Sequence, residues 1–338
     1  MDVNSIWRCH VAFVSSFRAI SKRRPATTCV LSVLCFFCYA IPALAFNCSM
    51  AATNIAFGNI DVTTGAAVSS SGTFTVTCSG SPSGQYMRMC VSVNGGSASD
   101  STSRLMNGPG AAQLRFQLYS DTGYTTPWGS WPANLYGGGY TWDVLGTTST
   151  STGTITFYGQ VLANQQTITA GSYSSSLTLF FTYDDHNNVA CPENGKGNSS
   201  TSFTATATVT TSCNVSATTL NFGSTGSLAS TIDATSPITV QCTNGAPYTL
   251  GLSAGNNAGG NPLLRRVIGG PSNELINYSL FSDAARTINW GNTSGTNWQT
   301  STGTGGTQTF TVYGRVPGGQ FLPQQGVYTD NVVVTVSY

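Results

Sequence analysis

Residues 313–338 read YGRVPGGQFLPQQGVYTDNVVVTVSY, and this stretch decides the fold class. Near its end, Val332, Val334, Val336 and Tyr338 fall on one face of an extended chain, while residues 333, 335 and 337 fall on the other. This alternation with a period of two predicts a β-strand. Glycine and proline residues between positions 318 and 326 indicate the connection that precedes the strand. The stretch therefore predicts two strands joined by a turn.

The same arrangement occurs earlier in the chain, at residues 158–183, which read YGQVLANQQTITAGSYSSSLTLFFTY. In both copies the Tyr-Gly pair and the final tyrosine are 25 positions apart. Cys48 also corresponds to Cys213, and the segment TFTVTC ending at Cys78 corresponds to PITVQC ending at Cys242. The chain is therefore a duplication. We expect an N-terminal domain at residues 46–190, a linker at 191–212 that includes a further strand, and a C-terminal domain at 213–338.

Each repeat consists of short alternating runs separated by turns rich in glycine, serine and asparagine, and neither repeat has a convincing helical period. This pattern is typical of an antiparallel β-sandwich. We therefore predict an all-β protein with two antiparallel β-sandwich domains in tandem.

The composition and the first residues indicate an exported protein. Only 7% of the 338 residues are charged, which argues against a nucleic-acid partner. Residues 1–45 have the form of a signal peptide, because basic residues precede the apolar run CVLSVLCFFCY and Ala43-Leu44-Ala45 matches a cleavage site. A membrane anchor is the alternative, although this apolar run is short for a membrane span.

Six cysteines remain after cleavage at this site, and an even number in an exported chain predicts three disulfides. The six are Cys48, Cys78, Cys90, Cys191, Cys213 and Cys242. Cys48–Cys78 and Cys213–Cys242 are the natural pairs, because each joins the first strand of a domain to the next predicted strand, across 30 and 29 positions. Cys90 and Cys191 have no counterparts in the second repeat, so we pair them by elimination.

The linker contains a segment that alternates like a strand, with Phe203, Ala205, Ala207 and Val209 on one side. It has two possible places in the fold. It is either the first strand of the C-terminal domain or a strand that pairs with the N-terminal domain and completes its sheet.

The residues that an enzyme would need are absent from the repeats. His186, in the linker region, is the one histidine after the cleavage site, so no nucleophile–histidine–acid triad can be built around the domain cores. No phosphate-binding glycine loop and no metal-ligand spacing occurs. We therefore expect a protein without catalytic activity, cofactor or bound metal.

Three segments of the second repeat point to a known family. They are CNVSATTLNFG from Cys213, NYSLFSDAARTINWG from Asn277, and FTVYGRV followed by GVYTDNVVVTVSY at residues 310–338. They resemble the spore coat protein U domain, the subunit fold of archaic (Csu-type) chaperone–usher pili. The first repeat keeps the first cysteine and the Phe-Gly, Ser-Asp and Tyr-Gly pairs, but has GYTTPW in place of AARTINW. Two such domains in one exported chain resemble the two-domain tip adhesin of these pili.

The resemblance implies an immunoglobulin-like sandwich that lacks one strand. A periplasmic chaperone, and then a neighbouring pilin subunit, would supply that strand to the C-terminal domain, and an outer-membrane usher would export the subunit to the pilus tip on the cell surface. The implied function is attachment and biofilm formation. A minor or shaft pilin, a spore- or cell-coat structural protein and a secreted carbohydrate-binding module are the alternatives. Since only Phe46 and Asn47 separate the expected cleavage site from Cys48, we expect this subunit to accept a strand but not to donate one.

A comparison of the repeats suggests where a ligand binds. Trp128 and Trp290 correspond, and so do Trp142 and Trp298, so we expect these four to pack internally. Between them the first repeat has a longer loop, SWPANLYGGGYT, where the second has NTSGTN. Its large side chains are Trp131, Leu135, Tyr136 and Tyr140. Aromatic loops on a rigid scaffold are common recognition surfaces, and with few charges nearby we expect this one to bind a hydrophobic surface or a glycan. The alternative is that these side chains fold back and cap the core.

Overall fold

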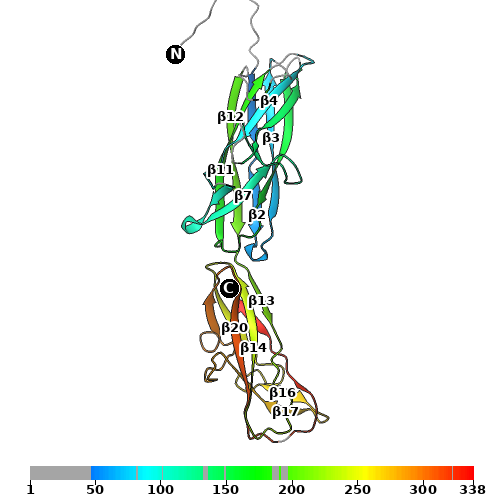
Figure 1. Ribbon diagram of the computed structural model, residues 1–338, viewed down its shortest axis with the longest axis vertical. Helices are drawn as coiled ribbons and strands as arrows, with labels where there is room; N and C mark the ends of the chain where they lie inside the picture. The colour runs from blue at the N-terminus through cyan, green and yellow to red at the C-terminus, as the bar shows by residue number, and fades with distance from the viewer. Residues whose placement is uncertain are drawn as a thin grey trace, which may run out of the picture. The chain divides into compact units, whose positions relative to one another are not determined.

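The structure is a computed structural model that describes residues 47–80, 83–100, 102–131, 136–147, 150–184, 190–191, 197–321 and 323–338 (Figure 1). The expected signal peptide at residues 1–45 lies outside the described residues, as do Leu135 and His186. Within the described ranges, no helix is long and apolar enough to cross a membrane.

The first sandwich, which we define as the described residues between 47 and 209, is built from strands and two short 3-10 turns. Its strands are β1 (Asn47–Ala52), β2 (Ile55–Ile60), β3 (Val68–Ser79), β4 (Tyr86–Val93), β5 (Ala98–Ser99), β6 (Arg104–Asn107), β7 (Gln113–Tyr119), β8 (Trp128–Ser130), β9 (Tyr140–Leu145), β10 (Thr150–Val161), β11 (Gly171–Asp184) and β12 (Gly197–Val209). The 3-10 turns are η1 (Val62–Thr64) and η2 (Pro109–Ala111).

The strands of the first sandwich form one hydrogen-bonded sheet in the order β1-β3-β10-β7-β6-β11-β12-β2. β4 joins this sheet through β11 and pairs with β9 on its other side. β12 and β2 run parallel, whereas β11 is antiparallel to both β12 and β4. Side chains alternate across each strand, so that in β11 Tyr173, Ser175, Leu177 and Leu179 point into the core while the residues that alternate with them point away from it.

The second sandwich comprises the described residues between 213 and 338. Its strands are β13 (Cys213–Ala217), β14 (Ile232–Cys242), β15 (Pro247–Leu252), β16 (Arg266–Gly269), β17 (Glu274–Asn277), β18 (Ser279–Phe281), β19 (Gln299–Thr302), β20 (Gln308–Val316), β21 (Tyr328–Thr329) and β22 (Val334–Ser337). They form three small sheets, with the orders β13-β14-β20-β18, β19-β15-β22 and β17-β16-β21. The all-β prediction is therefore confirmed for both repeats, and each sandwich encloses a hydrophobic core of its own.

Three disulfides cross-link the strands. Cys48–Cys78 and Cys213–Cys242 join β1 to β3 and β13 to β14, at positions where the two cysteines are paired directly across the strands. Cys90–Cys191 ties β4 to the segment that connects β11 with β12. These are the three pairs expected from the sequence.

A buried tryptophan and a buried arginine occupy equivalent places in the two sandwiches. The indole Nε1 of Trp128 donates to a carbonyl of β4 at 3.3 Å, and that of Trp290 donates to a carbonyl of β15 at 3.0 Å. The tryptophan carbonyls accept hydrogen bonds of 2.8 Å from the guanidinium groups of Arg104 and Arg265, respectively. The duplication therefore extends to the hydrogen bonds inside each core.

Candidate functional site

Strand β12 completes the sheet of the first sandwich. It pairs antiparallel with β11 along its whole length and parallel with β2. Its buried side chains are Phe203, Ala205, Ala207 and Val209. The ring of Phe203 lies 5.2 Å from that of Phe157 on β10. Of the two places that the sequence left open for this segment, the structure has the one in the N-terminal sheet, so that residues 197–209 belong to the first sandwich.

No described strand occupies the corresponding place in the second sandwich. β22 pairs with β15 on one side, and among the described residues no strand pairs with its other edge. The side chains on β22 and just beyond its two ends are therefore less covered than their equivalents on β11. Tyr338 is 61% exposed, whereas the equivalent Tyr183 is 5% exposed. Val332, Val334 and Val336 are only partly buried, while Leu177, Leu179 and Phe181 are at most 1% exposed.

The segment that corresponds to β2 differs for the same reason. In the first sandwich Ile55 and Phe57 lie on β2 and pack over Gly159, where an added Cβ would lie 2.5 Å from Ile55. In the second sandwich Leu220 and Phe222 pack in the same way over Gly314, yet residues 218–229 form no strand. β2 pairs with β12. Because no described strand takes the place of β12 in the second sandwich, residues 218–229 have no equivalent strand with which to form this pairing.

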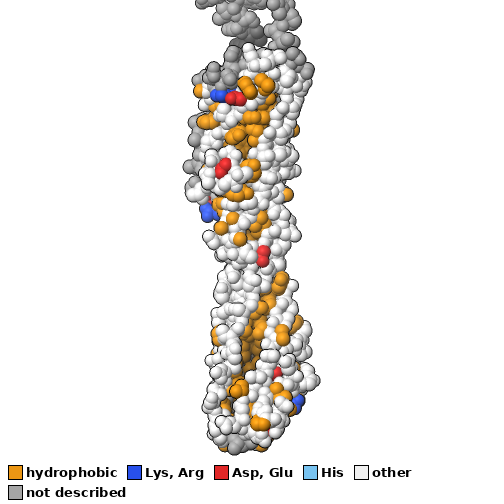
Figure 2. Space-filling view, turned by 90° about the vertical axis from the view of Figure 1, so that its right-hand side faces the viewer, with side chains coloured by type: hydrophobic (Ala, Val, Ile, Leu, Met, Phe, Trp, Pro, Cys, Tyr) orange, Lys and Arg blue, Asp and Glu red, His pale blue; other side chains and the backbone are white. Residues whose placement is uncertain are grey.

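The place of the absent strand is an apolar edge, which we call the open edge. By equivalence with the first sandwich it lies between β22 and residues 220–222. It is lined by partly buried apolar side chains, namely Leu220, Phe222, Tyr328, Val332, Val334 and Val336. An open hollow lined by Tyr248, Trp298 and Tyr338 adjoins the end of β22. Figure 2 shows hydrophobic side chains gathered in a lengthwise band on the second sandwich.

The open edge has the chemistry of a strand-binding site. A strand with one unpaired edge offers backbone N–H and C=O groups to another extended chain. Main-chain hydrogen bonds would hold that chain, while alternate side chains would enter the apolar pockets. Within the described parts of the chain, no cluster of three or more histidine, cysteine or acidic side chains could hold a metal ion.

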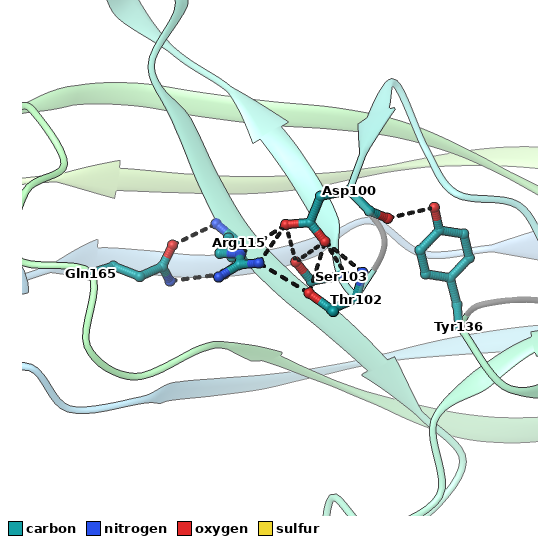
Figure 3. A network of polar contacts seen from close by, with 6 residues as sticks. All are labelled: Asp100, Thr102, Ser103, Arg115, Tyr136 and Gln165. Carbon is teal, nitrogen blue, oxygen red and sulfur yellow. Dashed lines mark hydrogen bonds and ion pairs between the residues drawn. The ribbon is translucent and has the colours of Figure 1, made fainter.

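Tyr136, expected on the binding surface, is instead buried. Its side chain is 8% exposed, and its ring lies 4.8 Å from the guanidinium carbon of Arg104. Its hydroxyl donates to the carbonyl of Asp100 at 3.4 Å (Figure 3). The reason for the difference is that the buried Arg104 offers this ring a cationic partner that the sequence did not reveal. Tyr136 is therefore a packing residue.

Trp131 and Tyr140 are half-buried, and Leu135 lies between them outside the described residues. The backbone N–H of Trp131 donates to the Ser92 hydroxyl at 3.1 Å. The Trp131 indole lies over Gly139, where an added Cβ would come within 2.2 Å of the ring. Tyr140 begins β9 and packs against the core. Only part of each side chain can therefore meet a ligand.

Asp100, whose carbonyl accepts the hydrogen bond from Tyr136, also binds several neighbouring groups through its carboxylate (Figure 3). Asp100 accepts hydrogen bonds from the backbone N–H groups of Thr102 and Ser103 at 2.7 Å, and it forms an ion pair of 2.6 Å with Arg115. Burial alone would raise the pKa of Asp100, but the hydrogen bonds from Thr102, Arg115 and Ser103 outweigh it and hold the pKa well below its ordinary value. Asp100 is therefore ionised throughout the neutral range.

Comparison with known proteins agrees with this architecture. The family model of the Spore Coat Protein U domain matches residues 35–179 and, a second time, residues 199–335. The chain belongs to the spore coat protein U domain family. The two matches correspond to the two copies of the duplication. The second match begins inside β12, although that strand lies in the sheet of the first sandwich.

Relatives and solved structures extend this assignment. Protein U of Myxococcus xanthus is 38% identical over 130 residues, which cover 36% of this chain and 72% of that protein. The CsuC–CsuE chaperone–tip adhesion subunit pre-assembly complex from archaic chaperone–usher Csu pili of Acinetobacter baumannii matches with a TM-score of 0.52 and 17% identity, covering 86% of this chain and 100% of that chain. The CupB6 tip adhesin from Pseudomonas aeruginosa matches with a TM-score of 0.36 and 10% identity, covering 87% and 94% of the two chains. At these identities the Csu likeness concerns the fold, and the predicted pilin-type, immunoglobulin-like sandwich is confirmed for this spore coat protein U family member.

Proposed function

We propose that this protein is the tip adhesin subunit of an archaic chaperone–usher pilus. The observation that carries the proposal is the difference between the two sandwiches. The first is completed by its own strand β12, whereas the second leaves the open edge uncovered. A molecule of this kind can be attached to a fibre through its second sandwich and present its first sandwich to the surroundings.

The partners follow from the open edge. An unpaired apolar edge would aggregate in the periplasm unless another chain covered it. A periplasmic chaperone would cover it first, an outer-membrane usher would export the complex to the cell surface, and a neighbouring pilin subunit would then replace the chaperone. The chaperone–tip subunit complex among the similar structures supports this order of partners.

Immunogold labelling of intact fibres tests the assignment to the tip. We expect one label at the end of each fibre, and loss of fibre-bound label when the candidate chaperone gene is deleted. Label along the fibre would identify a shaft or minor pilin instead. Label on the cell envelope that does not depend on a chaperone would identify a coat protein.

The ligand site of the first sandwich is proposed to be the surface around Trp131, Leu135 and Tyr140, with a hydrophobic surface or a sugar ring as ligand. Trp131 and Tyr140 are half-buried, which leaves part of each ring available for stacking or apolar contact. Changing Trp131 and Leu135 together to serine should reduce attachment to a hydrophobic surface at least tenfold without loss of fibres or of thermal stability. Tyr136→Phe is the matched control, because it keeps the buried ring and should attach normally. Unchanged attachment by the double variant would move the ligand site elsewhere.

A further inference from the structure

The first sandwich provides a template for the strand that the second sandwich lacks. Each inward residue of β12 lies directly opposite a known residue of β11. From Gly197 to Ala207, the facing pairs are Gly197–Tyr183, Ser199–Phe181, Thr201–Leu179, Phe203–Leu177, Ala205–Ser175 and Ala207–Tyr173. The repeat places Tyr338, Val336, Val334, Val332, Asp330 and Tyr328 at the corresponding positions of the second sandwich. The side chains that a bound strand must fit can therefore be compared position by position.

Three of these positions are smaller in the second sandwich. Phe181, Leu179 and Leu177 fill the space beneath the first half of β12, and all three are at most 1% exposed. Because Phe181 and Leu179 are large, the small side chains of Ser199 and Thr201 on β12 are enough to fill the remaining space opposite them. The second sandwich has valine at all three positions, and Val312 also replaces Phe157, which touches Phe203 in the first sandwich.

Protein interiors are packed to a nearly constant density, so volume lost from one side of a contact must be supplied by the other. A strand with the small residues of β12 would leave voids above Val334 and Val336. Larger apolar side chains at these positions would fill the space and cover the valines, which are now only partly buried.

The position opposite Asp330 has the reverse requirement. Asp330 is larger than Ser175, its counterpart, which is already buried beneath Ala205. Its carboxylate is held in place, since it accepts hydrogen bonds from the backbone of Asn256 at 2.8 Å and from the Tyr278 hydroxyl at 2.7 Å. A large side chain facing it would meet a fixed, bonded carboxylate. Since Ala205 faces the equivalent Ser175 in the first sandwich, we expect the residue that faces Asp330 to be small as well.

We infer that the strand bound at the open edge comes from another polypeptide, runs antiparallel to β22, and carries large apolar side chains opposite Val334 and Val336 but a small one opposite Asp330. This inference rests on the proposed strand-accepting function and specifies which strands are accepted. It also explains how the chain keeps its two sites distinct. β12 has the wrong side-chain sizes for the second sandwich, so it is not interchangeable with the partner strand.

The test uses synthetic peptides of residues 197–209 and the full chain without its signal peptide. The first peptide has the natural sequence, the second carries Ser199→Leu and Thr201→Leu, and the third carries Ser200→Leu and Ser202→Leu, which face outward in β12. A fourth adds Ala205→Leu to the second. Binding is measured by fluorescence anisotropy of labelled peptide, and hydrogen exchange of β22 and β11 reports which sandwich is occupied. If the free chain aggregates, the soluble yield after refolding with each peptide ranks them instead.

We expect the second peptide to bind at least tenfold more tightly than the natural one, from the added apolar burial, and to protect β22. The third should bind no better than the natural peptide, and the fourth should lose the gain of the second. If the outward leucines help as much as the inward ones, or if the natural peptide binds best, the inferred pattern is wrong while strand acceptance stands. If no peptide protects β22, the proposed strand-accepting function itself is wrong.

Discussion

At the scale of single residues, Arg265 shows how a charge can be stabilised inside a sandwich. Its guanidinium donates to the carbonyls of Ser253, Pro262, Leu252 and Trp290 at distances of 2.7–3.0 Å. Burial lowers the pKa of Arg265 to about 10, so the group remains protonated at neutral pH. Arg104 has the same role in the first sandwich, where burial lowers its pKa to about 9. Each arginine satisfies backbone carbonyls that strand pairing leaves free.

Arg265→Met should therefore destabilise the second sandwich by about 3 kcal/mol, because several buried carbonyls lose a charged donor at once. Arg266→Met is the matched control. The side chain of Arg266 is only partly buried and donates to one carbonyl, that of Asn257 at 2.9 Å, so the loss should be about 1 kcal/mol. Denaturant unfolding of the full chain measures both. Equal losses for the two variants would contradict this role.

Asp100 gives the first sandwich a dependence on pH. Its hydrogen bonds with Thr102 and Arg115 lower its pKa in the folded state, even though burial opposes the shift. The ionised carboxylate therefore stabilises the fold above its unfolded pKa of about 3.9, and this contribution is lost as the pH falls below that value. Asp100→Asn should flatten the decline in melting temperature between roughly pH 4 and pH 2. The transition of the second sandwich should not change, and an unaltered slope for the first would refute the assignment.

At the scale of elements, β12 decides the difference between the two sandwiches. Phe203→Asp places a carboxylate where the natural side chain is 2% exposed, so the first sandwich should lose several kcal/mol of stability, on the order of that of a small domain. Ser202→Asp is the control, because Ser202 lies on the exposed face of the same strand and the change should cost less than about 0.5 kcal/mol. Thermal unfolding followed by tryptophan fluorescence separates the two outcomes. Similar melting temperatures for both variants would mean that β12 does not complete the sheet.

Sequence patterns predicted the elements better than their partners. Alternation identified β11, β12 and β22, and the repeated cysteines indicated the first and last disulfides. The place of β12 stayed open, because alternation shows which face of a strand is buried but not which sheet it joins. The sequence predicts Tyr136 at a surface, whereas the structure packs its ring against Arg104. Arg104 is distant from Tyr136 in the chain, and an arginine in a sequence does not show that its side chain is buried. Leu220 and Phe222 repeat Ile55 and Phe57 in kind, yet only the latter form a strand, because strand formation depends on a partner.

At the scale of the whole molecule, the two copies of one fold are in different states. The first contains every strand of its sheet, while the second exposes Tyr338 and part of three valines. Burying apolar side chains is the main favourable contribution to folding, so the second sandwich should gain stability from any chain that covers its edge. Completion within the chain and completion by a partner are thus two solutions to the same structural requirement, and only the second leaves a site for assembly.

A strand appended after Tyr338 should convert the second state into the first. Residues 185–196 connect β11 to β12, so the appended segment begins with a connection of similar length. A copy of residues 197–209 follows, with leucine at the positions of Ser199 and Thr201. This copy could pair antiparallel with β22, as β12 pairs with β11. We expect the unfolding transition of the second sandwich to rise in temperature and the protein to remain soluble without a chaperone. The same variant should be absent from fibres, because its open edge is already filled, and cells that produce it should fail to attach even though the surface around Trp131 is intact. A glycine–serine tail of equal length is the control and should leave assembly unchanged. If the appended strand stabilises the second sandwich and the protein still enters fibres, the open edge is not the site through which it joins them.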